Sequence, residues 1–199
     1  MQYHVNGELI DRASATVSVD DRGFRYGDGA FESCRVYGGE VFAWDRHVER
    51  LMRTCETLGM PEAVPEDLAV RVAETLDAND FEDAYVRISI TRGVQPGKLT
   101  PGEAVDPTVV VYVKPLPRGG IDGERVWDGP AVVQSVKTRR IPDNALPADA
   151  KTLNYLNGIL ARLELRRASN EGYRPDEALM RNTDGYIAEG ATSNLFFVD

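Results

Sequence analysis

Residues 84–91 carry the sequence AYVRISIT, in which small or aliphatic side chains alternate with larger or polar ones. Successive side chains of a β-strand point to opposite faces, so the two sets would lie on opposite sides of a sheet. One set is Ala84, Val86, Ile88 and Ile90, and the other is Tyr85, Arg87, Ser89 and Thr91. The stretch therefore predicts a strand with one face on a hydrophobic core and the other toward solvent or a polar cavity.

Further strands are predicted on both sides of this one, at residues 3–5, 8–10, 30–37, 40–43 and 108–113. Asn6-Gly7 and Gly38-Gly39 stand at the turns of two predicted hairpins. The stretch 108–113 is uniformly apolar, which favours a strand that is buried on both faces. Residues 18–29, rich in Asp, Arg and Gly, are expected to form a loop.

Two helices are predicted between these strands, because apolar residues recur there at helical spacing. Asp45 is the expected N-cap of the first helix, and the second covers residues 65–79. Their inward stripes are Val48, Leu51, Met52, Cys55 and Leu58 in the first helix and Leu68, Ala69, Val72 and Leu76 in the second. Strands and helices in this order indicate an α+β fold.

A stretch rich in Pro and Gly, KPLPRGGIDGE at residues 114–124, has the composition of a linker. We therefore predict two domains, residues 1–118 and 126–199, joined by residues 119–125. The predicted elements of the second domain are a strand at 131–137, an irregular loop at 141–150, a helix at 152–168, a strand pair at 177–180 and 186–188, and a last strand at 195–198.

The composition excludes several classes of function. The net charge is −9 and the acidic residues are spread along the chain, so no nucleic-acid partner is expected. No apolar run approaches the length of a membrane span and the first residues lack a signal-peptide pattern, so a cytoplasmic location is expected. Because the histidines are only His4 and His47, and Cys34 and Cys55 form no CxxC pair, no metal site is expected.

Lysine chemistry has four candidates, which are Lys98, Lys114, Lys137 and Lys151. Lys151 stands where a predicted loop meets a predicted helix, and Tyr155 would share its helical face four residues on. A lysine becomes a nucleophile where burial or a cationic neighbourhood lowers its pKa. The alternative is a surface lysine at the start of a solvated helix, and position alone favours this alternative.

Glu189 and Arg50 each permit a functional and an ordinary interpretation. A carboxylate such as Glu189, after the predicted hairpin, could keep a pyridine nitrogen protonated. The guanidinium of Arg50, beside the apolar stripe of its helix, could grip a phosphate. Both residues could equally be solvated surface charges.

Tyr85 and Arg87 share the polar face of the strand at 84–91. Burying an arginine without a partner is costly, so this face should meet solvent or a polar cavity. With Arg35 and Tyr26 from the preceding segment, the two residues would line a carboxylate-binding pocket. The alternative is an exposed sheet face.

Together these segments resemble the class IV (fold type IV) aminotransferases, which use pyridoxal 5'-phosphate (PLP). The motifs are DRGFRYGDGAFESCRVYGGEVF at 21–42, HVERL at 47–51, AYVR at 84–87, KTLNYLNGIL at 151–160 and DEALMRNTDGYIAEGATSNLFFV at 176–198. The resemblance implies a two-domain α+β enzyme with a small N-terminal α/β sandwich domain and a larger PLP-binding domain. Family members continue well past NLFFV, so the C-terminal part of the large domain is expected to be missing from this sequence.

The resemblance also implies roles for matching positions. Lys151 would form the Schiff base with PLP and move the proton between substrate and cofactor. Glu189 would pair with the pyridine nitrogen, Tyr155 with the ring hydroxyl and Arg50 with the phosphate. The positions that line the substrate pocket in branched-chain members are Tyr26, Arg35, Tyr85 and Arg87. A homodimer is implied, with the partner subunit contributing to each pocket.

The family includes enzymes with three different activities, and different motifs of this chain resemble different ones. YVR at 85–87 and NYLNGIL at 154–160 favour an aminotransferase acting on a branched-chain-like L-amino acid and a 2-oxo acid. The loop DRGFRYGDGAFE and EGATSN look more like the other branches, so 4-amino-4-deoxychorismate lyase, which forms 4-aminobenzoate and pyruvate in the folate pathway, is the alternative. D-amino-acid aminotransferase ranks third, because ITRGVQPGKL at 90–99 lacks the arginine and histidine that typically follow there.

A different class of function is a non-catalytic relative or fragment that serves as a dimerisation module. The missing C-terminal portion favours this interpretation. Lys151, Glu189 and Arg50 argue against it, because a non-enzyme has no evident need for all three.

Overall fold

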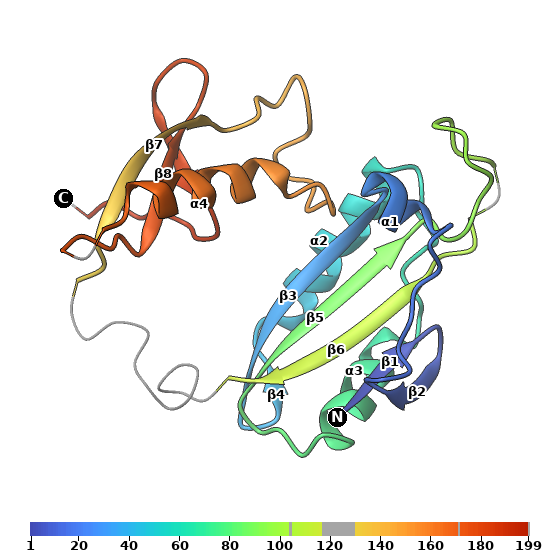
Figure 1. Cartoon of the computed structure of the whole chain (residues 1–199). Helices are drawn as coiled ribbons and strands as arrows, with labels where there is room; N and C mark the ends of the chain where they lie inside the picture. The colour runs from blue at the N-terminus through green and yellow to red at the C-terminus, as the bar shows by residue number, and fades with distance from the viewer. Residues whose placement is uncertain (104, 117–129, 171, 199) are drawn as a thin grey trace. The chain divides into compact units, whose positions relative to one another are not determined.

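Helices and strands form two separate units in the computed structural model of the chain, which describes residues 1–103, 105–116, 130–170 and 172–198 (Figure 1). The first unit takes in the described residues up to 116 together with Asp149–Leu153, and the second takes in the remainder. The elements are β1 (Gln2–Val5), β2 (Glu8–Asp11), α1 (Arg22–Tyr26), β3 (Gly29–Tyr37), β4 (Glu40–Val41), α2 (Trp44–Thr57), α3 (Leu68–Asp77), β5 (Ala84–Thr91), β6 (Val109–Pro115), β7 (Val133–Arg139), α4 (Leu156–Ala168), β8 (Glu177–Arg181) and β9 (Ile187–Gly190).

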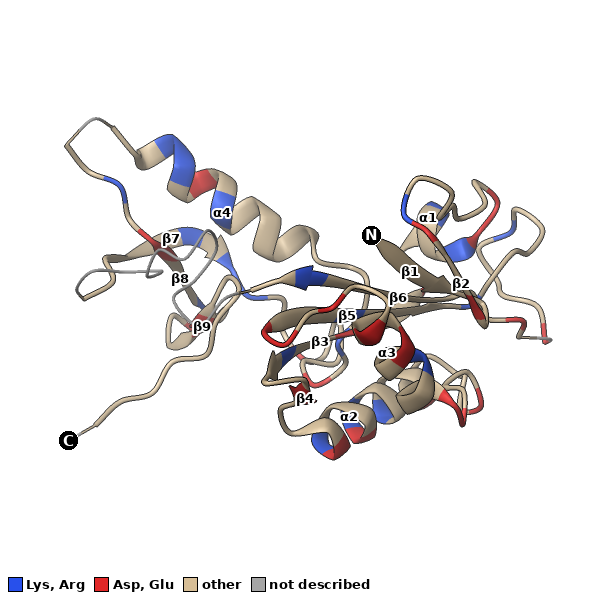
Figure 2. Cartoon of the chain, turned by 90° about the horizontal axis from the view of Figure 1, so that it is seen from below, with Lys and Arg blue, Asp and Glu red and all other residues tan. Residues whose placement is uncertain are grey.

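The first unit is built on a six-stranded antiparallel sheet, the large sheet, with the strand order β2-β1-β6-β5-β3-β4. β5 is central, and the predicted alternation is confirmed up to Ile90, since Ala84, Val86, Ile88 and Ile90 are all buried. It fails at Thr91, which is also buried and donates its hydroxyl to the Asp21 carboxylate. α2 and α3 both lie against this buried face, as Figure 2 shows from below. The opposite face of the sheet carries Tyr85 and Arg87, so the candidate site residues of β5 lie on the side away from α2 and α3.

The apolar stripes of the two helices are only partly as predicted. Leu51 and Cys55 of α2 are buried, but Met52 is 49% exposed and Thr54 is buried in its place. In α3 the side chain of Thr75 is likewise buried, whereas the predicted Ala69 is exposed. Both threonines satisfy their hydroxyls by donating to the carbonyl four residues earlier, which removes the cost of burying them.

Three local predictions in the first unit are wrong. The expected loop at 18–29 contains α1, which is capped by the buried carboxylate of Asp21. α2 begins one residue before Asp45, and its N-cap is Ala43 in a left-handed conformation at φ 53°. β6 is buried on one face only, because Val110 and Tyr112 alternate with its buried valines on the face opposite α3.

The segment Asp149–Leu153 pairs with the edge of β3. The backbone N–H of Phe31 donates to the carbonyl of Lys151 at 2.9 Å, the N–H of Leu153 donates to Gly29 at 2.9 Å, and Thr152 is bridged antiparallel to Ala30. The helix predicted from residue 152 therefore begins only at Leu156, and Lys151 and Tyr155 do not share a helical face. These residues belong to the first unit, although the sequence assigned them to the second domain.

The second unit contains a three-stranded sheet, the small sheet, in which β7 runs parallel to β8 and β9 runs antiparallel to β8. The hairpin predicted across Asp184-Gly185 is confirmed. The strand predicted at 195–198 is not formed, because no described strand pairs with it, and Phe196 is 87% exposed. The predicted linker at 119–125 lies outside the described residues and stays a prediction. No helix in the described ranges combines the length and the apolar character that a membrane crossing needs.

Candidate active site

Lys151 is tied to two elements of the first unit by its backbone. Its carbonyl accepts from Phe31 of β3, and its N–H donates to the Thr54 hydroxyl of α2 at 3.1 Å. The same hydroxyl donates to the Arg50 carbonyl at 2.9 Å. The segment that carries Lys151 is thereby joined to the helix that carries Arg50, so two predicted site residues share one scaffold.

Two cations lie over the ring of Phe31. The Lys151 Nζ lies 4.5 Å from the ring centre, and the guanidinium carbon of Arg87 lies 3.8 Å from it. Phe31 itself is 5% exposed, so the ring is a rigid platform that attracts positive charge through its π face. The arrangement brings the predicted nucleophile and a predicted anion-binding group to one place.

Tyr85 lies on the same face of β5 as Arg87 and is held by polar and aromatic contacts. Its hydroxyl lies 2.8 Å from the Ser33 hydroxyl, and its ring centre lies 6.5 Å from that of Tyr112. Tyr3 continues the row, 5.4 Å from Tyr112 between ring centres. This aromatic row could bind a flat or apolar group beside the cations.

Arg35 is engaged elsewhere on this face. Its guanidinium donates to the Leu116 carbonyl, lies 3.8 Å from the Asp83 carboxylate and stacks over Tyr37. It also stands four residues beyond Phe31 along β3, which corresponds to about 13 Å. The described contacts of Arg35 thus place it away from the junction at Phe31.

Tyr26 belongs to α1, before β3. Its ring lies 5.0 Å from the guanidinium carbon of Arg22, and 37% of the residue is exposed. The described contact of Tyr26 therefore lies within α1, and none in the described ranges joins it to Arg87.

Arg50 forms a charge cluster with Glu32 and His47. The Arg50 Nε donates to Glu32 at 2.5 Å and one terminal nitrogen donates to the other oxygen at 2.7 Å, while the His47 Nδ1 lies 2.8 Å from Glu32. Burial by itself raises the pKa of the fully buried Glu32, but the hydrogen bonds and charges of Arg50 and His47 outweigh it and hold that pKa below its ordinary value. The fork of Arg50 is therefore oriented by an ionised carboxylate, while 41% of its side chain is exposed.

Glu189 and Tyr155 belong to the second unit. Glu189 stands on β9, where its carboxylate forms an ion pair with Arg140. Tyr155 is the N-cap residue of α4 and is 41% exposed. A carboxylate and a phenol are thus available on this unit.

Sequence reasoning missed Glu32, His47, Thr54 and Arg140. Two of them had a readable signal, because His47 is three residues from Arg50 on one helical face and Glu32 alternates with Ala30 and Cys34 on the core side of β3. Thr54 and Arg140 had none, since their contacts with Lys151 and Glu189 join residues far apart in the chain.

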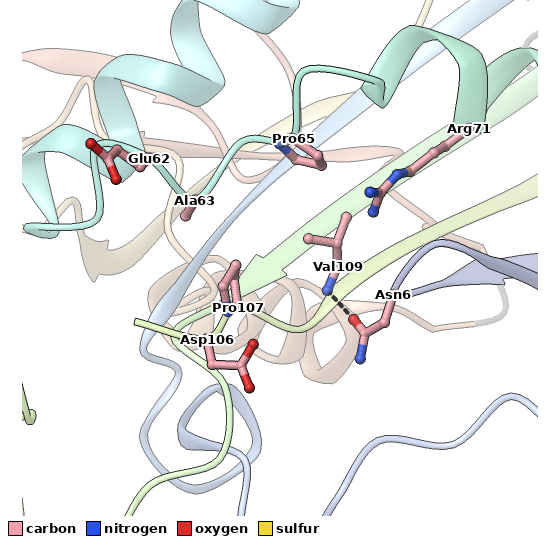
Figure 3. Close-up of a pocket in the computed structure, with 8 residues that line it drawn as sticks. All are labelled: Asn6, Glu62, Ala63, Pro65, Arg71, Asp106, Pro107 and Val109. Carbon is pink, nitrogen blue, oxygen red and sulfur yellow. Dashed lines mark hydrogen bonds between the residues drawn. The ribbon is translucent and has the colours of Figure 1, made fainter. Parts of the chain in front are cut away.

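The hollow drawn in Figure 3 lies elsewhere in the first unit. Its volume is about 290 Å³, and it is lined by Asn6, Glu62, Ala63, Pro65, Arg71, Asp106, Pro107 and Val109. None of these residues was predicted as a site residue. Its one guanidinium, that of Arg71, is held by Asp67 at 2.8 Å. The chemistry therefore points to the surroundings of Lys151 rather than to this hollow.

The fold and these residues define a class of protein, the fold type IV enzymes. Residues 29–199 match the family described as amino-transferase class IV, so the chain belongs to the class IV aminotransferases. The resemblance seen in the sequence is thereby confirmed.

Relatives of the chain come from more than one branch of the family. It is 36% identical to a putative branched-chain-amino-acid aminotransferase of Methanocaldococcus jannaschii, over 100% of this chain and 65% of the relative. It is 28% identical to the D-alanine aminotransferase of Bacillus licheniformis, over 98% of this chain and 65% of the relative. The chain therefore spans about 65% of the length of these relatives.

Solved structures that resemble the chain also come from more than one branch of the family. The branched-chain aminotransferase of the archaeon Thermoproteus uzoniensis, solved with norvaline, matches with a TM-score of 0.81 and 29% identity, over 96% of this chain and 63% of that one. The 4-amino-4-deoxychorismate lyase of Pseudomonas aeruginosa matches with a TM-score of 0.74 and 30% identity, over 96% and 64%.

Proposed function

We propose that this chain is part of a PLP-dependent aminotransferase that transfers an amino group between an L-amino acid, branched-chain-like by preference, and a 2-oxo acid. The observation that carries the proposal is the junction at Phe31. There Lys151 and Arg87 share one aromatic ring, and the Lys151 backbone is bonded through Thr54 to the helix of Arg50. A primary amine beside an anion-binding cation is what transfer between amino and oxo acids requires.

The donor set matches the functional groups of PLP. An amine suits its aldehyde, a guanidinium its phosphate, a carboxylate its ring nitrogen and a phenol its ring hydroxyl. The residues that would supply these groups are Lys151, Arg50, Glu189 and Tyr155, respectively. When bound, PLP withdraws electrons from the substrate α-carbon.

The residues of this chain would then divide the work. The Lys151 amine would hold the aldehyde group of PLP and, once released, would carry the proton between the substrate α-carbon and the cofactor carbon that bore the aldehyde. Glu189, oriented by its ion pair with Arg140, would keep the pyridine nitrogen protonated. Arg50, oriented by Glu32, would hold the phosphate.

Substrate binding is assigned to the open face of the large sheet. Arg87 would pair with the substrate carboxylate, and Tyr85 with the aromatic row would bound the side-chain pocket. The structure of a branched-chain aminotransferase with N-(5'-phosphopyridoxyl)-L-glutamate supports the L-amino-acid preference, and the one with norvaline supports an aliphatic side chain. Another, with pyridoxamine 5'-phosphate, supports the cofactor. Arg35 and Tyr26 would act only at the margin of this pocket, since their described contacts lie elsewhere.

The second candidate is 4-amino-4-deoxychorismate lyase activity, which the structural match to that enzyme favours. D-amino-acid transfer is the third, supported by the D-alanine aminotransferase relatives. Both would use the same lysine. A homodimer, in which a partner subunit completes the pocket, and a cytoplasmic location complete the proposal.

The test begins with the cofactor. The protein is incubated with PLP, reduced with borohydride and digested, and the modified lysine is located by mass spectrometry. The expected result is an adduct on Lys151, which disappears in the Lys151→Ala variant. Adducts scattered over Lys98, Lys114 and Lys137 would contradict the proposal.

The reaction is tested next on the same preparation. Glutamate should convert the bound cofactor to its amine form, seen as a change of absorbance, and a branched-chain 2-oxo acid should reverse it. Pyruvate release from aminodeoxychorismate without any change with amino acids would instead identify the lyase. Conversion by D-alanine but not by L-amino acids would identify the third activity.

A further inference from the structure

One buried carboxylate of the second unit has no role in the function proposed above. Glu177 begins β8 and is 8% exposed, and both of its oxygens accept hydrogen bonds. One oxygen accepts from the Thr192 hydroxyl at 2.8 Å and from the Ser193 hydroxyl at 3.0 Å. The other accepts from the Ala178 N–H at 2.8 Å and lies 3.3 Å from Arg162.

These donors keep the carboxylate ionised. Burial by itself raises the pKa of Glu177, but the hydrogen bonds from Thr192, Ala178 and Ser193 and the charge of Arg162 outweigh it, so the pKa lies below its ordinary value. Hydrogen bonds to a charged acceptor are about twice as strong as neutral ones. Glu177 is therefore a firm anchor for the segment that contacts it.

The anchored segment is a tight turn. The Gly190 N–H donates to the Ser193 carbonyl at 2.9 Å, and the Ala191 N–H donates to Ala178 at 3.0 Å. A β-carbon added at Gly190 would lie 2.3 Å from the Ser193 hydroxyl oxygen and 3.2 Å from the Glu177 side chain. The turn thus closes onto Glu177 without room for another atom.

The turn comes immediately after Glu189. We propose that Glu177 is a positioning residue, which holds the turn at residues 190–193 and, through it, the end of β9, so that the Glu189 carboxylate has one orientation toward the pyridine nitrogen of PLP. Only the last clause rests on the proposed function. Arg140 contacts the Glu189 carboxylate itself, whereas Glu177 contacts the hydroxyls of Thr192 and Ser193 in the turn that follows Glu189.

Glu164 offers a matched control in the same unit. Its carboxylate accepts from the N–H of Lys137 at 2.6 Å and from the N–H and hydroxyl of Thr138 at 3.0 Å each. It ties α4 to β7 and makes no described contact with the turn. Glu164→Ala therefore removes a carboxylate that also accepts three hydrogen bonds, although it is less buried than Glu177, without touching the segment after Glu189.

The first measurement is amide hydrogen exchange of the protein without added PLP. Glu177→Ala should raise the exchange rates of Gly190 and Ala191 at least about tenfold, and Glu164→Ala should leave them unchanged. Glu177→Gln should restore most of the protection, because its carbonyl can still accept from the Ala178 N–H while its two amide hydrogens can be donated to the Thr192 and Ser193 hydroxyl oxygens. Unchanged exchange in Glu177→Ala, or equal changes in both alanine variants, would overturn the proposal.

The second measurement is PLP binding, followed by absorbance over a pH series. Glu177→Ala should weaken PLP affinity about tenfold and shift the pH midpoint of the bound cofactor's absorbance, as losses of orienting side chains do. Glu164→Ala should do neither. A loosened turn with unchanged affinity and midpoint would overturn the link to Glu189. If the wild-type protein takes up no PLP, the proposed function fails, while the exchange result still decides whether Glu177 holds the turn.

Discussion

Helices α2 and α3 cover the same face of the large sheet, but the buried polar groups beneath them are treated differently. Under α2, the carboxylate of Glu32 is fully buried and accepts from Arg50 and His47. Under α3, His4 is 2% exposed, its Nδ1 has no hydrogen-bond partner in the described part of the chain, and its Nε2 lies 3.5 Å from Glu74. Both helices pack on the core, but only α2 carries a candidate site residue, Arg50, whose charge compensates the buried carboxylate beneath it.

The largest effect is expected at Glu32. Glu32→Ala should lower the free energy of unfolding by about 3 kcal/mol, the lower end for breaking a buried ion pair, because half-exposed Arg50 keeps part of its hydration. Urea denaturation measures the change. Glu49→Ala is the control on the same helix, where an exposed pair at 4.0 Å should be worth less than about 1 kcal/mol. If Glu32→Ala and Glu49→Ala lowered the free energy of unfolding equally, the distinction between the buried and the exposed ion pair would be contradicted.

A smaller effect is expected at Thr54, and α3 provides its counterpart. Thr54 and Thr75 are both buried and both donate to the carbonyl four residues earlier, but only Thr54 also accepts from Lys151. Thr54→Val should therefore cost about 1–3 kcal/mol by leaving that N–H unpaired, and Thr75→Val about 1 kcal/mol. PLP loading of Lys151, read by mass spectrometry, should fall only in Thr54→Val. Loading lost in both variants would mean that general destabilisation is responsible.

The smallest effect is expected from pH. Stability should fall with falling pH at both His4, under α3, and Glu32, under α2, but over different pH ranges. Burial first, and then the charge of Arg71, lower the pKa of His4 below its ordinary 6.5, against the opposing charges of Glu74 and Asp67. As the pH falls, His4 therefore binds a proton in the unfolded state before it does so in the folded state. Its contribution to stability is complete above pH 6.5 and is lost as the pH falls through the lowered pKa. Unfolding measured between about pH 8 and 5 should show this loss in wild type and less of it in His4→Gln.

Glu32 should respond only in more acidic solution. Its folded pKa lies below the ordinary 4.5, so its contribution is complete above 4.5 and is lost as pH falls through the lowered value. The His4→Gln variant should keep this second loss, and Glu32→Gln should lack it. If stability fell over one pH range only, and either His4→Gln or Glu32→Gln removed that fall, the assignment of separate pH ranges to the two helices would be contradicted.

Much of the fold was predictable because local patterns and global packing agree. The alternation at 84–91 has the same cause in the sequence and in the structure, namely a strand with one face on the core. The hairpin turns at Asn6-Gly7 and Asp184-Gly185 are likewise short-range signals.

The failures come from contacts between distant residues. Residues 152 and 153 carry no local signal against helix, but their segment pairs with β3, more than a hundred positions earlier, so α4 does not begin there. Thr54 is not predictable as a site residue, because a threonine does not extend an apolar stripe, yet its hydroxyl accepts from the Lys151 N–H. Of the candidate site, residue types and order along the chain were predictable. The hydrogen-bond and ion-pair partners of Arg50, Arg35 and Glu189 could be identified only from the structure.

The excursion of Asp149–Leu153 makes the two units interleaved in sequence, because the chain leaves the first unit, re-enters it for five residues and leaves again. A gene cut at the predicted linker would therefore encode an N-terminal piece in which the Phe31 N–H and the Gly29 carbonyl of β3 have lost their partners and could pair with another strand. The C-terminal piece would carry Lys151 on a segment that has lost its pairing with β3. Dissection of this protein should divide it as two complementing fragments that fold on mixing, rather than as two independent domains.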